Sequence, residues 1–146
     1  MTSWKTFAEQ APEIAAFGEA RFRSGVAYLG TIRSDGGPRV HPVTPIVGEY
    51  LFLFMEPTSP KGYDLRRDGR YAMHCSVSNS SGESGEFFVA GRATFIDDPA
   101  TRKLAVELAT YAPADRYILF ELDVESASST IYTDGQPVRQ RWKSGD

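Results

Sequence analysis

Apolar and polar residues follow patterns along the chain whose period changes several times. Near the N-terminus, Trp4, Phe7 and Ala11 recur at the spacing of one helical face. Pro12 fits the first position of a helix but not its interior, so the pattern predicts two short helices over residues 3–22. We expect these helices to flank or cover the structure that follows.

From Val26 onward the pattern becomes that of β-strands. Residues 26–34 are rich in β-branched and aromatic side chains, and the strong turn sequence Ser34-Asp35-Gly36-Gly37 comes at their end. Residues 38–47 are then predicted as the returning strand and residues 50–55 as a third. Three antiparallel strands in a meander are the natural interpretation.

Two prolines interrupt the middle strand of this meander. Pro42 and Pro45 cannot donate hydrogen bonds to a neighbouring strand. The strand is therefore expected to be bulged or to lie at an edge there, with backbone groups left free. A ligand would account for them, and so would a barrel corner, which is slightly the more frequent case.

The rest of the chain continues with short strands and two more helices. A helix is predicted at 59–68, and Asp97-Asp98-Pro99 is a capped start for another that ends before Pro113. Gly91 is expected to mark a bend or a close approach inside a long strand. The further strands are predicted at 71–77, 86–96, 117–124 and 127–133.

About six strands at short spacing, with no alternating strand-helix repeat, favour a mainly β fold. We predict one domain over residues 1–146, an antiparallel β-barrel with flanking helices. Its parts are N-terminal helices at 1–22, the barrel with two inserted helices at 23–135 and a basic tail at 136–146.

The start of the 59–68 helix suits a phosphate. Ser59 and Pro60 form a typical helix start, where free backbone N–H groups and the positive end of the helix dipole gather. Lys61 follows at once, the arginines of residues 66–67 lie on the same helix, and Arg39 lies on a preceding strand, so an anion would be attracted here. A capped surface helix with solvated charges explains this stretch, taken alone, equally well.

Composition narrows the range of functions. The chain has 146 residues, 41% of them hydrophobic and 24% charged, which is typical of a globular domain. A net charge of −3 argues against nucleic acid or an anionic membrane as a partner. A single cysteine and the lack of an apolar membrane-span pattern lead us to expect a cytoplasmic protein.

Several familiar sites are missing from the sequence. It contains no glycine-rich phosphate loop and no HExxH motif. His74 and Cys75 are neighbours in a predicted strand, so their side chains point to opposite faces and cannot share a metal ion. We therefore expect no metal site.

Three runs of residues carry a resemblance to a known family. They are Gly37-Pro38-Arg39-Val40-His41-Pro42-Val43-Thr44, then Leu51-Phe52-Leu53-Phe54, and then Ser59-x-Lys61-x-x-Asp64-Leu65-Arg66-Arg67-Asp68-x-Arg70. Together with Val89-x-Gly91-x-Ala93, they resemble the pyridoxamine 5′-phosphate oxidase-like family over about residues 22–125.

The resemblance implies a six-stranded antiparallel split β-barrel of Greek-key type, usually a homodimer that binds FMN or a deazaflavin between its two copies. It implies that Ser59 and Lys61 meet the cofactor phosphate and that Arg39 contributes to the same contact. It places five residues around the ring system: Val40, His41, Thr44, Phe54 and Met55. No catalytic acid or base is implied, and His41 is the one residue among these that titrates near neutral pH.

The sequence also departs from that family. Pro60 and Thr44 stand where the true oxidases carry cations, and a charged hydrogen bond contributes roughly 1.5–3 kcal/mol. Glu86 falls near a position commonly held by glutamine. The C-terminus has no Arg-x-His-x-Arg segment, and Arg139-Gln140-Arg141-Trp142 is a loose echo of it. Oxidation of a vitamin B6 phosphate is therefore not expected.

Two hypotheses follow from the sequence. The first is an oxidoreductase that uses FMN or a deazaflavin and acts on a small molecule. The second is a non-catalytic barrel that stores or senses a flavin, haem or another ligand, and the two missing cations favour it.

Overall fold

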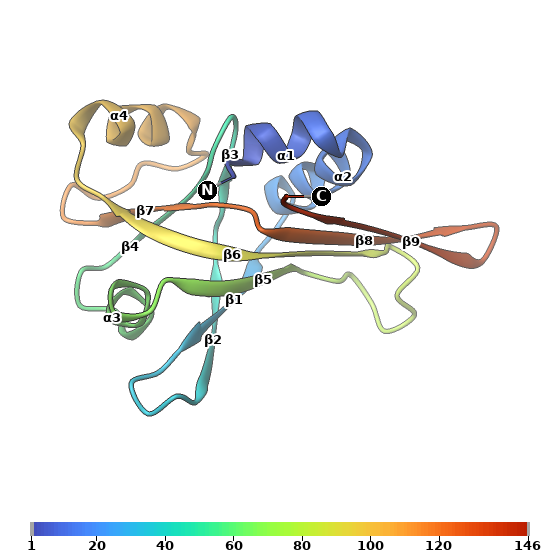
Figure 1. Cartoon of the computed structure of the whole chain (residues 1–146), viewed down its shortest axis with the longest axis horizontal. Helices are drawn as coiled ribbons and strands as arrows, with labels where there is room; N and C mark the ends of the chain where they lie inside the picture. Colours follow the sequence, from blue (N-terminus) through green and yellow to red (C-terminus); the bar gives the residue numbers. More distant parts are fainter. Residues whose placement is uncertain (1, 146) are drawn as a thin grey trace.

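Nine β-strands and four α-helices form the described part of the chain, residues 2–145 of this computed structural model (Figure 1). The helices are α1 (Trp4–Gln10), α2 (Pro12–Arg23), α3 (Pro60–Arg67) and α4 (Pro99–Leu108). The strands are β1 (Ala27–Ile32), β2 (Pro38–Val43), β3 (Ile46–Val47), β4 (Leu51–Met55), β5 (Arg70–Cys75), β6 (Glu86–Ile96), β7 (Ile118–Leu122), β8 (Ser126–Thr133) and β9 (Gln136–Lys143).

The long strand β6 joins the two halves of a curled antiparallel sheet. One edge of β6 pairs with β5, while the other edge pairs with β8 along its first half and with β7 along its second half. The strand order is β2-β1-β5-β6-β7-β4-β3, and the β8–β9 hairpin branches from β6 (Figure 1). This is a split β-barrel with flanking helices, as the sequence predicts.

The split in the barrel lies between β2 and β3. Only Thr44 and Pro45 separate these strands in the chain, yet they stand at opposite ends of the strand order. Within the described residues β2 pairs with β1 alone, so Pro42 sits on an edge strand where its missing N–H is tolerated. The prediction of an edge or corner at the two prolines is confirmed.

Three other predictions about the strands are wrong. The meander does not form, because β4 pairs with β3 and β7 and not with β2. The count of about six strands is too low, since β3 is a separate strand and β9 follows the strand predicted at 127–133. The basic tail at 136–146 contains strand β9, which pairs along its whole length with β8 through a turn where Asp134 and Gly135 have φ of 52° and 75°.

Gly91 lies where β6 passes from one half of the sheet to the other. A Cβ at this position would collide with the backbone and the carboxylate of Asp123 in the connection from β7 to β8. Asp123 is held by hydrogen bonds with the Arg92 backbone, and its carbonyl accepts from the Tyr71 hydroxyl at 2.6 Å. The close approach predicted at Gly91 is confirmed.

Aromatic side chains attach the first two helices to the sheet. Trp4, Phe7, Phe22 and Phe87 are each at most 2% exposed. The Trp4 and Phe7 rings meet edge to face at 5.1 Å, and so do the Phe22 and Phe87 rings. These contacts form the main core together with the inner faces of β1, β5 and β6, while α4 covers a second cluster around Phe52 and Leu119.

The two predicted helix caps are present. The Ser59 hydroxyl accepts from the Gly62 N–H at 3.3 Å at the start of α3, and the Asp98 carboxylate accepts from the Thr101 N–H at 3.0 Å at the start of α4. Pro60 and Pro99 occupy the first helical positions.

Arg21 on α2 fastens the loop between β5 and β6 at both ends. Its guanidinium donates to the carbonyls of Ser84 at 2.6 Å and Gly85 at 3.1 Å, and to the carbonyl of Ser76. The loop between these points contains Asn79 and several serines and glycines. A single side chain therefore closes the loop at its base.

Across residues 2–145, none of the helices combines the length and the apolar character that crossing a membrane would require.

Candidate functional site

The face of β2 that turns toward α3 carries Arg39 and His41. Side chains alternate along this strand, so Arg39, His41 and Val43 are half-buried while Pro38, Val40 and Pro42 are exposed. The register places Arg39 opposite Thr31 and His41 opposite Leu29 on β1, and α3 packs against β1. Two cationic or titratable side chains of an edge strand thus face a helix start.

Asp64 on α3 is the centre of a network of hydrogen bonds. Its carboxylate is 3% exposed and accepts from the Arg39 Nε at 2.7 Å and from an Arg67 amino group at 2.9 Å. The buried Thr31 hydroxyl donates to it at 2.7 Å. Burial alone would raise the pKa of the Asp64 carboxyl, but its three hydrogen-bond donors hold that pKa below the usual value. Asp64 therefore stays ionised and fixes the position of Arg39.

Lys61 stands in the first turn of α3 near these groups. Its side chain is half-buried, and burial lowers the pKa of its ammonium group. Among residues 2–145 no ion pair involves Lys61. An anion placed here would offset the cost of burying this charge.

His41 is close enough to this cluster to feel its charge. Burial is the main cause of a lowered pKa for the imidazole, and repulsion from Lys61 and Arg39 lowers that pKa further. The imidazole is therefore neutral at neutral pH, and the site holds the positive charges of Lys61 and of Arg39 and Arg67, less the negative charge of Asp64.

The structure brings together part of the predicted set of site residues. Arg39, His41, Ser59 and Lys61 gather where β2 meets the start of α3. Met55 lies beneath the same turn, because a Cβ added at Gly62 would come within 3.3 Å of the Met55 Sδ.

Three predicted residues point elsewhere. Val40 faces outward with 66% of its surface exposed. Thr44 lines a separate hollow with Phe22 and Leu108. The Phe54 ring belongs to the second core cluster, where the Arg102 guanidinium lies 5.1 Å from its centroid.

Sequence reasoning missed the roles of Asp64 and Thr31. Asp64 was part of the matching run, but nothing in its local sequence indicates that it binds an arginine 25 positions earlier. Thr31 is one of the two β-branched residues in β1. Only the register of β1 with β2 and the packing of α3 bring the two together.

No protein-family model matches the sequence, and no curated protein matches it either. Solved structures do match the fold. A haem-binding protein from Mycobacterium smegmatis superposes with a TM-score of 0.68 at 19% identity over 88% of this chain, which spans 57% of the length of that protein. A protein of the pyridoxinephosphate oxidase family from Clostridium acetobutylicum, related to general stress protein 26 of B. subtilis, gives 0.63 at 12% identity over 96% of both chains.

The fold is the pyridoxamine 5′-phosphate oxidase-like split β-barrel. A third split barrel, PhzG from Burkholderia lata in complex with tetrahydrophenazine-1-carboxylic acid, matches with a TM-score of 0.56 at 13% identity over 94% of this chain and 91% of that one. The fold predicted from the sequence is thus confirmed, and identities this low establish the fold alone.

Proposed function

We propose that this protein binds a flavin-type cofactor, FMN or a deazaflavin, and acts as an oxidoreductase on a small molecule. The observation that carries the proposal is the half-buried Lys61 at the start of α3, without an ion pair in residues 2–145 and beside Arg39 and His41. A half-buried cation at a helix start is suited to a phosphate. The pyridoxamine 5′-phosphate oxidase-like fold of the chain supports the same choice, because the family resemblance implies a flavin-type cofactor.

The residues present fit the phosphate end of such a cofactor. The Lys61 ammonium and the backbone N–H groups of the first turn of α3 would bind the phosphate, and the Arg39 guanidinium would add to them from β2. The Asp64 carboxylate accepts a hydrogen bond from the Arg39 Nε and so fixes the plane of the guanidinium. The cofactor, when bound, supplies the electron transfer, and the protein supplies its position and electrostatic surroundings.

The net charge of this cluster is compatible with either FMN or a deazaflavin. Asp64 neutralises part of the charge of Arg39 and Arg67, and Pro60 and Thr44 contribute no cation. This is a smaller positive charge than a dedicated FMN phosphate site would have, so a deazaflavin with different charges on its side chain is an alternative ligand.

We also propose that the protein works as a homodimer. The outward face of β1 and β2 carries Tyr28 and Val40, which are 47% and 66% exposed, and Pro42 lies opposite Tyr28 on the same face. No helix in residues 2–145 covers this patch, whereas α1, α2 and α4 pack elsewhere. A second copy of the chain would bury the patch beside the proposed cofactor site.

Exchange of Lys61 for alanine tests the cofactor proposal. Lys61→Ala should weaken FMN binding about tenfold or more, because a charged hydrogen bond to phosphate is lost. Riboflavin has the same ring without the phosphate, so its affinity should stay nearly unchanged. Both affinities can be measured by quenching of flavin fluorescence, and deazaflavin binding by the same titration.

Arg33→Ala is the matched control, since Arg33 is an exposed cation in the turn between β1 and β2 that pairs with Asp35. It should change neither affinity. If Lys61→Ala lowers the affinities for FMN and riboflavin equally, or lowers neither, the phosphate assignment is wrong.

A second candidate function is ligand binding without catalysis. In the part of the site that residues 2–145 form, the carboxylate beside His41 is that of Asp64, which already accepts from Thr31, Arg39 and Arg67. A carboxylate held in this way is not free to act as a general acid or base, which favours storage or sensing of a flavin or haem. The M. smegmatis neighbour with this fold is a haem-binding protein. The absorption spectrum of freshly purified protein separates flavin, deazaflavin and haem, and a flavin that is not reduced by any nicotinamide or deazaflavin donor would favour this second candidate.

A further inference from the structure

The hairpin β8–β9 ends the sheet with a free edge. It extends from β6 beyond the rest of the barrel (Figure 1), and within residues 2–145 β9 pairs with β8 alone. The Ser144 N–H donates to the Glu125 carbonyl at 2.8 Å, which sets the alternation of hydrogen bonds along the hairpin. Even-numbered residues of β9 therefore direct their backbone groups to β8. Arg139, Arg141 and Lys143 direct theirs outward, where a further strand would meet them.

The opposite edge of the sheet, at β2, is closed to such pairing. There the Arg33 N–H donates to the Gly37 carbonyl at 2.8 Å. By the same alternation, the outward-directed residues of β2 are Pro38, Val40 and Pro42. The two prolines have no N–H to donate, so a strand cannot add here. On β9 the residue next to the turn is a proline as well, but the cationic residues that follow on this edge keep their N–H groups.

The residues of β9 that bond outward are also its cations. Their side chains alternate onto one face, and no ion pair within residues 2–145 involves Arg139, Arg141 or Lys143. Two copies that paired through this edge would place like charges opposite one another, which is unfavourable. A strand with acidic residues opposite these positions would meet an unlike charge at each of them. The charge of the edge therefore selects against a second copy and for an acidic segment.

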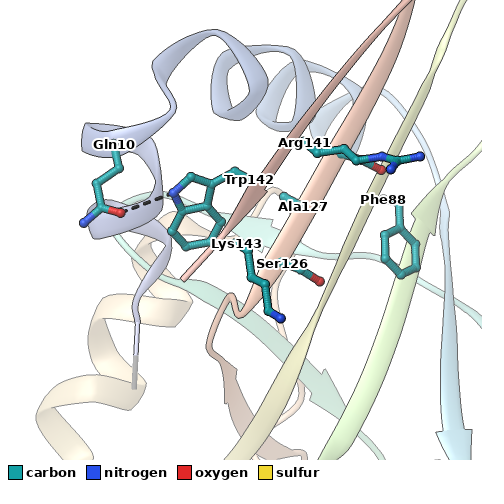
Figure 2. Close-up of a pocket in the computed structure, with 8 residues that line it drawn as sticks. Gln10, Phe88, Ser126, Ala127, Arg141, Trp142 and Lys143 are labelled. Carbon is teal, nitrogen blue, oxygen red and sulfur yellow. Dashed lines mark hydrogen bonds between the residues drawn. The ribbon is translucent and has the colours of Figure 1, made fainter. Parts of the chain in front are cut away.

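The opposite face of β9 lies against the helices. Figure 2 shows the Trp142 indole directed to Gln10 of α1, to which it donates at 3.2 Å, while Arg141 points to the other side. Gln140 also faces the helices, since its side-chain amide donates to the Glu13 carboxylate at 3.2 Å. An added strand would thus place alternate side chains beside the cations on one face and beside α1 and α2 on the other.

A hollow of about 450 Å³ lies between β9 and the start of α2. A side chain opposite Gln140 in an added strand would point toward this hollow, because residues directly opposite one another share a face of the sheet. Apolar atoms at the start of α2 would contact that side chain, whereas the Glu13 carboxylate would repel an acidic one. The hollow therefore fixes the register, with acidic residues on the outward face and an apolar residue toward α2. Its lining consists of Ala11, Pro12, Glu13, Ile14, Gln140 and Arg141.

We propose that the free edge of β9 binds an extended acidic segment of a partner protein, which adds to the sheet as an antiparallel strand. Its acidic residues lie opposite the cations of β9, and an apolar residue between them enters the hollow beside Gln140. Backbone hydrogen bonds supply the affinity, and the alternation of acidic and apolar side chains supplies the specificity. This edge uses neither the cluster around Lys61 nor the patch at Val40, so it does not depend on the proposed function.

The probe is a fluorescein-labelled peptide in which glutamate and valine alternate, and its binding is followed by fluorescence anisotropy. It should bind about tenfold or more tightly than a peptide with lysine in place of glutamate, because the edge repels the lysines. A peptide of the same composition, with its glutamates and valines in separate blocks, should bind about tenfold more weakly as well. N-methylation of the peptide amides that face β9 should weaken binding about tenfold, and it tests the backbone bonds on the unchanged protein.

Two changes at one position separate charge from backbone pairing. Arg141→Ala removes the cation and keeps the N–H, and it should weaken binding of the alternating peptide about threefold. Arg141→Pro removes the N–H as well and should weaken binding by about a further fivefold, because a proline at an edge blocks strand addition. The Arg141 N–H does not bond to β8, so thermal unfolding followed by circular dichroism should show that both variants are folded.

Two controls separate this proposal from the others. Lys61→Ala, which tests the flavin site, and Val40→Glu, which tests the pairing of copies, should leave peptide binding unchanged. Equal binding by the Arg141→Ala and Arg141→Pro variants, equal binding of the alternating and block peptides, or no binding of any peptide would overturn the proposal. If Arg141→Pro converts a wild-type dimer into a monomer, a second copy occupies the edge, and the proposal is likewise wrong.

Discussion

At the scale of single residues, Asp64 organises the candidate site. One buried carboxylate connects β1 through Thr31, β2 through Arg39 and the end of its own helix through Arg67. Because Arg67 also donates to the Ile32 carbonyl at 2.7 Å, the two strands of the β1–β2 hairpin and α3 are fastened at a single place. Asp64 therefore contributes both to stability and to the position of a proposed phosphate ligand.

Asp64→Ala should lower the free energy of unfolding by about 2–3 kcal/mol. The change leaves two arginines without their counter-charge and a buried threonine hydroxyl without its acceptor. The value is at the lower end for a broken buried pair because Arg39 and Arg67 are 29% and 42% exposed. Urea unfolding followed by circular dichroism measures it.

The pH dependence of the same measurement has a fixed sign. The folded-state pKa of Asp64 lies below its ordinary value of 3.8, so the ionised carboxylate stabilises the fold above that pH, and this stabilisation is lost as the pH falls through the folded pKa. The difference between wild type and Asp64→Ala should shrink on acidification. Glu56→Ala, which removes an exposed pair with Arg116, should change stability little at any pH, and an equal effect of the two changes would contradict the role of Asp64.

At the scale of elements, local sequence signals predicted where helices begin, but they did not predict which strands pair. The caps at Ser59 and Asp98 fixed the starts of α3 and α4, because capping depends on residues within one turn. The meander failed for the opposite reason. Strand pairing depends on the direction of the chain after the bend at Thr44 and Pro45. The identity of these two residues does not predict that β3 joins the opposite end of the sheet from β2.

The C-terminal hairpin shows the same limit. Asp134-Gly135 is a strong turn sequence, but most residues of β9 are exposed and carry no strand-like apolar alternation, so the sequence indicates only a basic tail. Its pairing with β8 and the packing of Trp142 on Phe7, at 4.9 Å between ring centroids, are tertiary effects. The side of the hairpin that carries Arg141 and Lys143 could not be predicted before this pairing was known.

Gly91→Ala should destabilise the protein by about 1–3 kcal/mol, since the added Cβ forces the Asp123 connection away from β6. Gly30→Ala is a matched control in another strand, where the nearest atom to a new Cβ, the Ala72 carbonyl oxygen, lies 3.5 Å away in ordinary contact. Thermal unfolding compares the two variants. If both have the same melting temperature, the junction at Gly91 is looser than its geometry indicates.

At the scale of the whole molecule, the barrel has one face covered by helices and one face left open. Trp4, Phe22 and Phe87 fill the covered face, and the open face carries exposed apolar side chains at one end and cations at the other. Hydrophobic periodicity revealed the covered face. It could not locate the apolar patch, because Tyr28 and Val40 become neighbours only through the pairing of Gly30 with Val40 and of Tyr28 with Pro42.

If this patch pairs two copies of the chain, Val40→Glu should convert a dimer into a monomer, because the change would bury one carboxylate from each copy in the interface. Sedimentation velocity at several concentrations measures the change. Val138→Glu places the same charge on a valine that is 46% exposed in β9 and should leave the dimer intact. A wild-type protein that sediments as a monomer at all concentrations would contradict the proposal.

The fastening of the β5–β6 loop by Arg21 has a consequence for engineering. Both ends of the loop are fixed to the same guanidinium, at Ser76 and at Ser84. Lengthening the loop between these two residues would therefore cost only the small extra entropy of closing a longer loop. Added residues would extend into solvent without separating β5 from β6. The tip of this loop is accordingly a natural position for grafting an epitope or a fluorescent peptide, attached to the barrel through one arginine.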